Sequence, residues 1–170
     1  MTRRAAVALI AMLLAACGRG PNTTATSPSL AVVTTTTLHQ VTAAEAAAFV
    51  IDLMGASNAT DDAFLVAHLD PVVTGVYGEA ACAAHIRALP HQSRVAVTAT
   101  EGPANYAFPY DTLTITVPNV FTVRVDDTTT GKVVHGAVHV GTSGGVPRWF
   151  VDCGTPLPSD QRNLPAYETE

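Results

Sequence analysis

The spacing of apolar side chains changes once along this chain of 170 residues, at Pro90. Before Pro90, from about residue 41, apolar residues recur every three to four positions, as on the buried stripe of a helix. After Pro90 they alternate with polar residues, as in a strand with one buried face. Helices that all precede the strands do not make β-α-β units. The sequence therefore predicts an α+β domain, with helices packed on one face of an antiparallel sheet.

Two or three helices are expected in the first part of this domain. Thr42 and Glu45 match a capping box, which would begin a helix that Gly55 is placed to end. A second, short helix would begin after Thr60. A third would run from residue 71 or 72 to residue 89, where proline follows.

Five segments after Pro90 alternate between apolar and polar residues: 94–101, 112–117, 120–126, 133–140 and 146–153. Turn-rich sequences separate most of them, so we expect an antiparallel sheet of four to five strands. The folded domain would then cover residues 41–156. Residues 157–170 show no periodicity, and we expect them to form an irregular tail.

The N-terminus has the features of a bacterial lipoprotein signal peptide, which would cover residues 1–16. A short basic start precedes the apolar run 5–13, which is too short to span a bilayer. Residues 14–17, Leu-Ala-Ala-Cys, resemble a lipobox, in which Cys17 receives a diacylglyceryl group before cleavage. The alternative is an ordinary secretory peptide cut after Ala16, and the export route (general or twin-arginine) stays open. Acyl chains on Cys17 would anchor the protein to the outer side of the cytoplasmic membrane.

Residues 17–40 would link this anchor to the domain. They are rich in Thr, Ser, Pro and Gly and hold few large apolar residues. Such a segment buries too little surface to offset its ordering entropy, so we expect a disordered stalk.

The charge balance excludes one class of partner. The chain carries 9 Lys and Arg against 14 Asp and Glu, a net charge of −5. Nucleic-acid binding requires a basic surface, so no nucleic-acid partner is expected.

Two cysteines remain once Cys17 is assigned to the lipid. Cys82 lies in the expected third helix and Cys153 ends the last expected strand. An even number of cysteines outside the cytoplasm favours a disulfide, which would join the helices to the sheet. A reactive thiol pair is the alternative, but the two cysteines lack a C-x-x-C spacing.

Segments 68–71 (HLDP), 76–79 (VYGE), 121–125 (FTVRV) and 148–154 (RWFVDCG), together with Cys82, resemble the nuclear-transport-factor-two-like superfamily. The resemblance is nearest to small lipoproteins of high-GC Gram-positive bacteria. It implies helices packed on a strongly curved sheet, which together form a cone. The superfamily includes ketosteroid isomerases, dehydratases and polyketide cyclases, and also non-catalytic binding domains. The fold therefore implies no particular activity.

Strand alternation assigns side chains to the two faces of the sheet. If Cys153 points toward the helices, the inward set is apolar: Phe121, Val123, Val125, Val134, Val138, Val140, Trp149 and Val151. The outward set is Arg124, Asp126, His135, His139, Arg148, Phe150 and Asp152. We therefore predict a cone poor in ionisable groups, with no catalytic residue assigned.

A few residues remain as candidates for a pocket or for proton transfer. Tyr77, Glu101, Phe121 and Trp149 would line a pocket in the cone. Tyr77, Glu101 and His68 are the side chains to test as acid or base, although each also fits a structural or rim position.

No metal or cofactor is expected. His135 and His139 share a face, but four strand residues separate them by about 13 Å, too far for one zinc ion. The sequence has no glycine-rich phosphate loop and no G-x-S-x-G motif.

These observations favour a lipid-anchored, non-enzymatic domain that binds a small apolar ligand in the cone or an envelope protein through its sheet. Thr122, Arg124, His135 and His139 would lie on that sheet surface. The alternative is a small isomerase or dehydratase that acts on a hydrophobic substrate in the cone.

Overall fold

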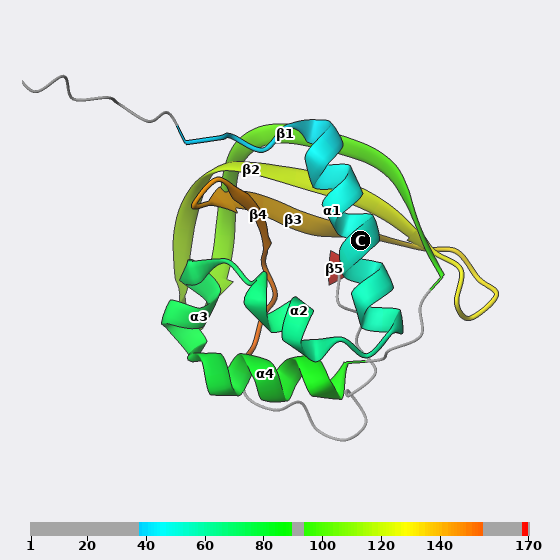
Figure 1. The fold of residues 1–170 in the computed structure, drawn as a ribbon, viewed down its shortest axis with the longest axis horizontal. Coiled ribbons are helices and arrows are strands. Elements are labelled where there is room, and N and C mark those ends of the chain that lie inside the picture. The colour runs from blue at the N-terminus through cyan, green and yellow to red at the C-terminus, as the bar shows by residue number, and fades with distance from the viewer. Residues whose placement is uncertain (1–37, 90–93, 155–167, 170) are drawn as a thin grey trace, which may run out of the picture. The chain divides into compact units, whose positions relative to one another are not determined.

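The computed structural model describes residues 38–89, 94–154 and 168–169. The predicted signal peptide, Cys17 and nearly all of the predicted stalk lie outside the described residues. Within them, four helices precede the sheet along the chain, and the sheet is antiparallel (Figure 1). This confirms the predicted α+β class. No helix among the described residues is long and apolar enough to cross a membrane.

Helix α1 spans Ala43–Asn58 and packs mainly against β1. Its capping box is formed: the Glu45 backbone N–H donates to the Thr42 hydroxyl, and the Glu45 carboxylate accepts from the Thr42 N–H. The helix continues past Gly55, where the sequence predicted its end. A glycine inside a helix costs only about 1 kcal/mol, and the buried Met54 and Ser57 hold this last turn against the core.

Three shorter helices follow: α2 at Asp62–Ala67, α3 at Pro71–Tyr77 and α4 at Glu79–Ala88. The sequence predicted one helix where α3 and α4 form two. Gly78 separates them with φ 85° and ψ 143°, a backbone conformation that only glycine adopts easily. The break turns α4 back against α2.

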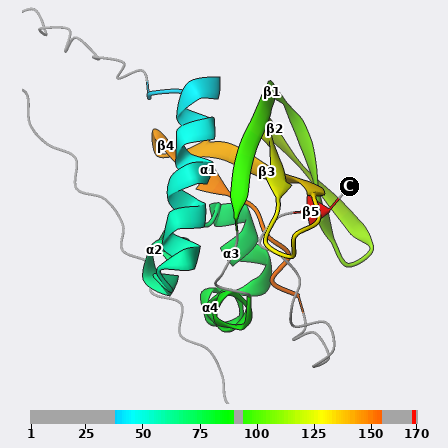
Figure 2. The same ribbon diagram turned by 90° about the vertical axis from the view of Figure 1, so that its right-hand side faces the viewer.

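The sheet has the order β1-β2-β3-β4, with β1 at Val95–Tyr110, β2 at Leu113–Asp127, β3 at Val134–Ser143 and β4 at Val146–Trp149. Segments 112–117 and 120–126, predicted as two strands, belong to the single strand β2. The tail predicted to be irregular contributes β5, Glu168–Thr169, which pairs with β3. Figure 2 shows α1 and α2 on one side of the sheet and β5 on the side away from them.

The long hairpin of β1 and β2 bends at its middle (Figure 1). Gly102 has φ 109°, and a Cβ atom there would lie 2.9 Å from the carbonyl oxygen of Val120. Opposite, Asn119 has φ 58°, and the register between β1 and β2 shifts between Glu101 and Tyr106. Such irregularities bend a strand pair without ending it. Strand β1 therefore continues to Tyr110, although the sequence predicted its end at Glu101.

The face of the sheet that meets α1 forms the main core. The predicted inward residues Phe121, Val123, Val125, Val138, Val140 and Trp149 are all buried. The Trp149 indole N–H donates to the Leu65 carbonyl at 2.9 Å, which ties β4 to α2. Val134 is an exception: it lies at the start of β3 and is 37% exposed.

The prediction for Phe150 was also wrong, because this outward residue is buried. It was expected to point outward into solvent, yet it is only 6% exposed. The reason is that the bent hairpin also buries part of the second face of the sheet, where Phe150 contacts Tyr106 and Phe108.

The predicted disulfide is present. Cys82 of α4 and Cys153 lie with their Cα atoms 4.8 Å apart, and both side chains are buried. Cys153 follows β4 instead of ending it. The bond therefore holds α4 to the segment that leaves the sheet.

We expect the double variant Cys82→Ala/Cys153→Ala to lose about 2–4 kcal/mol of unfolding free energy. The cysteines are 71 residues apart, and a cross-link that closes so long a loop restricts the unfolded chain strongly. Urea unfolding of the oxidised protein, the reduced protein and the double variant measures this loss. Equal unfolding midpoints for all three would contradict a stabilising disulfide.

Candidate ligand-binding site

Aromatic side chains gather on the second face of the sheet, at the far end of the bent hairpin. We define the aromatic cluster as Tyr77, Tyr106, Phe108, Tyr110 and Phe150. The ring centroids of Tyr77 lie 6.2 Å from Phe108 and 5.3 Å from Tyr110, both edge-on. Phe150 lies 5.3 Å from Tyr106 and 5.9 Å from Phe108. Such edge-to-face and tilted contacts are favourable for aromatic pairs.

Three different elements supply the cluster. Alternation along β1 places Tyr106, Phe108 and Tyr110 on the same face once the bend is passed. Tyr77 is the last residue of α3, which turns it toward this face. Phe150 follows β4, and its ring covers Gly141, where a Cβ atom would lie 3.2 Å from the ring. A larger residue at Gly141 would displace the ring.

A polar network borders the cluster on β3. The His139 ring stacks on Tyr106 with centroids 3.9 Å apart. Its Nε2 lies 3.3 Å from the Glu168 carboxylate, and its Nδ1 lies 3.3 Å from the Thr122 hydroxyl. The Tyr106 hydroxyl donates to the same Glu168 carboxylate at 2.8 Å. Glu168 of β5 therefore joins a tyrosine of β1 to a histidine of β3.

Burial and the nearby carboxylates set the protonation of this site. Burial raises the pKa of Tyr106 above its usual range, and the hydrogen bond to Glu168 raises it further. Burial also raises the pKa of Tyr77, as does the nearby Asp152 carboxylate. Both hydroxyls therefore stay protonated near neutral pH, and the Tyr106 hydroxyl donates to Glu168.

The pKa of Glu168 is lowered, in contrast to the raised pKa values of the two tyrosines. Its hydrogen bond with His139 lowers its pKa, and the Tyr106 hydroxyl lowers it further, while partial burial opposes both. Glu168 is therefore an ionised acceptor held by Tyr106 and His139. On the other side of the cluster, burial lowers the pKa of His85, although the Asp152 carboxylate partly offsets this.

The structure does not bring the predicted pocket residues together. Tyr77 belongs to the aromatic cluster, but Phe121 and Trp149 are buried in the main core. Glu101 is exposed on the second face, where Arg124 donates to it at 3.1 Å. The ring of His68 stacks on Phe64 at 4.0 Å, a packing role in α2.

Two other outward residues of the sheet form a local pair, whereas Arg148 donates to the Ala67 carbonyl of α2. His135 Nδ1 lies 2.8 Å from the Asp126 carboxylate, in a pair that is largely exposed. Exposed pairs of this kind contribute little to stability. Among the residues that the structure describes, no group of three or more side chains could hold a metal ion.

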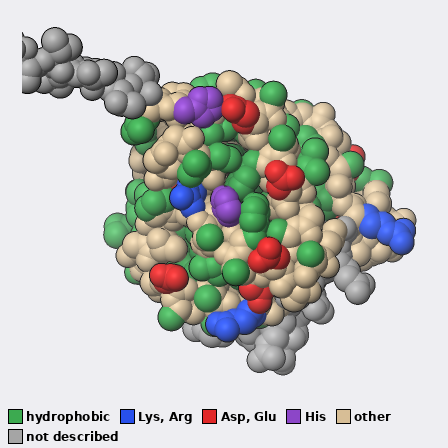
Figure 3. Space-filling model, in the orientation of Figure 1, with side chains coloured by type: hydrophobic (Ala, Val, Ile, Leu, Met, Phe, Trp, Pro, Cys, Tyr) green, Lys and Arg blue, Asp and Glu red, His purple; other side chains and the backbone are tan. Residues whose placement is uncertain are grey.

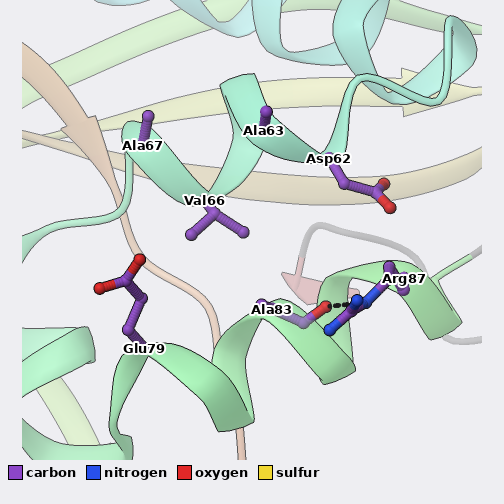
Figure 4. A pocket seen from close by; sticks show the side chains of 7 residues that line it. All are labelled: Asp62, Ala63, Val66, Ala67, Glu79, Ala83 and Arg87. Carbon is purple, nitrogen blue, oxygen red and sulfur yellow. Dashed lines mark hydrogen bonds between the residues drawn. The ribbon is translucent and has the colours of Figure 1, made fainter.

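A shallow groove of about 400 Å³ lies between α2 and α4 (Figure 4). Val66 of α2 and Glu79 of α4 point into the space between the helices. Arg87 donates back to the Ala83 carbonyl of its own helix. On the face shown in Figure 3, acidic and basic side chains are scattered among hydrophobic ones and do not form one charged patch.

Comparison with protein families, curated proteins and solved structures finds no match to this chain. The site is therefore interpreted from its own chemistry.

Sequence reasoning missed most of this site. Tyr106, Phe108 and Tyr110 alternate in the sequence, but Pro103 and Pro109 interrupt the segment, and proline is disfavoured inside strands. The alternation of three aromatic residues is the signal that could have identified it. Glu168 carries no such signal, because its partners are 62 and 29 residues away in the chain.

We expect Glu168→Gln to remove a pH-dependent part of the stability. Because the folded pKa of Glu168 lies below its unfolded value near 4.5, its stabilisation is complete above that value. It is lost as the pH falls through the folded pKa. The melting temperature of the wild type should therefore exceed that of Glu168→Gln at pH 7, and the difference should shrink toward pH 3. Glu79→Gln, which removes an exposed charge on α4, is the control. A difference that is constant with pH would contradict this role for the carboxylate.

Proposed function

We propose that this chain is a lipid-anchored protein of the cell envelope whose domain binds a ligand or a partner without transforming it. We further propose that the domain belongs to the nuclear-transport-factor-two-like superfamily. The order of the elements supports this membership: helices first, then a bent antiparallel sheet. The resemblance of segments such as 148–154 supports it as well.

The location is supported by two independent features of the sequence. Residues 14–17 match a lipobox at the expected distance from a basic start. The buried Cys82–Cys153 disulfide suits an oxidising compartment, since disulfides rarely persist in the cytoplasm. The anchor would hold the domain at the outer surface of the cytoplasmic membrane.

The aromatic cluster is the observation that carries the binding function. Its three tyrosines are partly exposed over the buried rings of Phe108 and Phe150, and the hydroxyls of Tyr77 and Tyr106 stay protonated beside carboxylates. Ligand sites usually combine such apolar walls with a few fixed polar groups. The Tyr106 hydroxyl and His139 already hold one carboxylate, that of Glu168, beside the rings. An acidic group on an apolar or extended molecule could take the place of that carboxylate.

A small isomerase or dehydratase acting on a hydrophobic substrate is the alternative. The observation that favours it is His139 stacked against Tyr106 at the aromatic cluster. A general acid or base must reach the proton of a substrate. Both ring nitrogens of His139 already face Thr122 and Glu168. This arrangement favours binding over proton transfer.

The anchor is tested with Cys17→Ala. We expect the wild-type chain to sediment with the membrane fraction and Cys17→Ala to be released, because the acyl chains are lost. The variant Cys82→Ala/Cys153→Ala also loses cysteines but keeps the lipobox, and it should stay in the membrane fraction. Retention of Cys17→Ala in the membrane would show that the lipobox assignment is wrong.

The binding function is tested by native mass spectrometry of the full chain purified from the envelope of its host. We expect a bound species on the wild type and its loss in Tyr77→Ala, because Tyr77 contributes both a ring and a hydroxyl to the site. Ile51→Ala, at an exposed position of α1, is the control and should keep the bound species. Chemical conversion of that species by the wild type would favour the enzyme alternative.

A further inference from the structure

We propose that the edge of β3 opposite β2, with Tyr106 and His139 beside it, is a docking site for an extended acidic segment of a partner protein. Glu168 and Thr169 of this chain would occupy that site until the partner displaces them. This inference rests on the proposed binding function and names its partner class. We call the backbone of residues 134–138 with the side chains of Tyr106 and His139 the β3-edge site.

The backbone of β3 provides the first part of the argument. One side of β3 pairs with β2 from Val134 to Val140. The other side pairs with β4 only from Val140 to Ser143. Next to β4, the Phe150 N–H donates to the His139 carbonyl at 3.3 Å. Among the described residues, the stretch 134–138 of this edge pairs only with β5, at Gly136 and Ala137. An unpaired strand edge exposes N–H and C=O groups that an extended peptide can bond.

The side chains provide the second part. The Glu168 carboxylate accepts from the Tyr106 hydroxyl at 2.8 Å and lies 3.3 Å from His139 Nε2. The stacked rings hold both groups in place, and the His139 side chain is only 13% exposed. A carboxylate is therefore recognised at a defined position beside a defined strand register. An acidic residue within an extended segment meets both requirements.

The third part is that the internal occupant covers little of the site. β5 has two residues, both exposed, and the Glu168 side chain is 60% exposed. So short a strand makes few hydrogen bonds, and each contributes little net stability. A longer segment could also pair with residues 134 and 135 and cover the apolar side chains of Val133 and Val134, which are 56% and 37% exposed. A partner strand can therefore gain contacts that β5 does not make.

The test uses the full chain in detergent and a fluorescent peptide with the sequence of residues 164–170, LPAYETE, as the acidic extended probe. Fluorescence anisotropy measures its binding. We expect weak binding to the wild type, because a tethered occupant competes at an effective concentration in the millimolar range. Glu168→Gln should bind the peptide about 10-fold more tightly, since it weakens that occupant. Glu79→Gln removes the same charge at an exposed helix position and should behave like the wild type.

Further variants distinguish the contribution of strand pairing from that of the carboxylate contact. Thr169→Pro should also raise the affinity, because proline disfavours strand pairing without changing Glu168. Adding Tyr106→Phe to Glu168→Gln should weaken peptide binding about 10-fold or more, as expected for the loss of a hydrogen bond to a charged group. A scrambled peptide of equal composition should not bind.

Three results would overturn the proposal. The first is equal binding of the scrambled peptide, or no binding to any variant. The second is peptide binding that Tyr106→Phe leaves unchanged. The third is a dimer of Glu168→Gln that forms with rising concentration in light scattering, because the occupant would then be a second copy of this chain. None of these results depends on the bound species seen by mass spectrometry, so failure of the β3-edge site is distinguishable from failure of the proposed function.

Discussion

The bend in the β1–β2 hairpin is the constraint on which the rest of this structure depends. Gly102 permits it, because a side chain there would collide with the backbone of β2, and Asn119 permits the matching turn of the opposite strand. A flat sheet would bury one face under α1 and α2 and leave the other to solvent. The bent sheet buries its first face under α1 and part of its second face against α3. The aromatic cluster exists because of this second buried surface.

The polar groups of the second face depend on the same bend. The bend brings the Tyr106 ring over the His139 ring. The Tyr106 hydroxyl and His139 Nε2 of this stacked pair then contact the Glu168 carboxylate. The fold thus combines apolar rings, protonated hydroxyls and an open strand edge within a small area. That combination supports the proposals of a binding domain and of an acidic, extended partner. The disulfide holds α4 to the segment that follows β4. Phe150 of the aromatic cluster belongs to that same segment.

Local patterns predicted much of the fold because they act over a few residues. The capping box of Thr42 and Glu45, the alternation of Phe121, Val123 and Val125, and the order of helices before strands need no distant partner. The disulfide followed from the cysteine count and the expected oxidising compartment. Parity failed at Phe150, however, because it assumes that a sheet has one buried face. The end of α1 and the break at Gly78 were also missed, since distant packing decides whether a glycine interrupts a helix.

The sequence by itself therefore determined the α+β class, the main core and the pairing of Cys82 with Cys153. The first two follow from short-range periodicity, and the pairing follows once Cys17 is assigned to the lipid. Only the tertiary structure decided the candidate site. Tyr106, His139 and Glu168 lie on three strands, and their meeting depends on the bend of the sheet and on the return of β5 to β3. Contacts between residues so far apart arise from the global packing of the chain, and no local pattern encodes them.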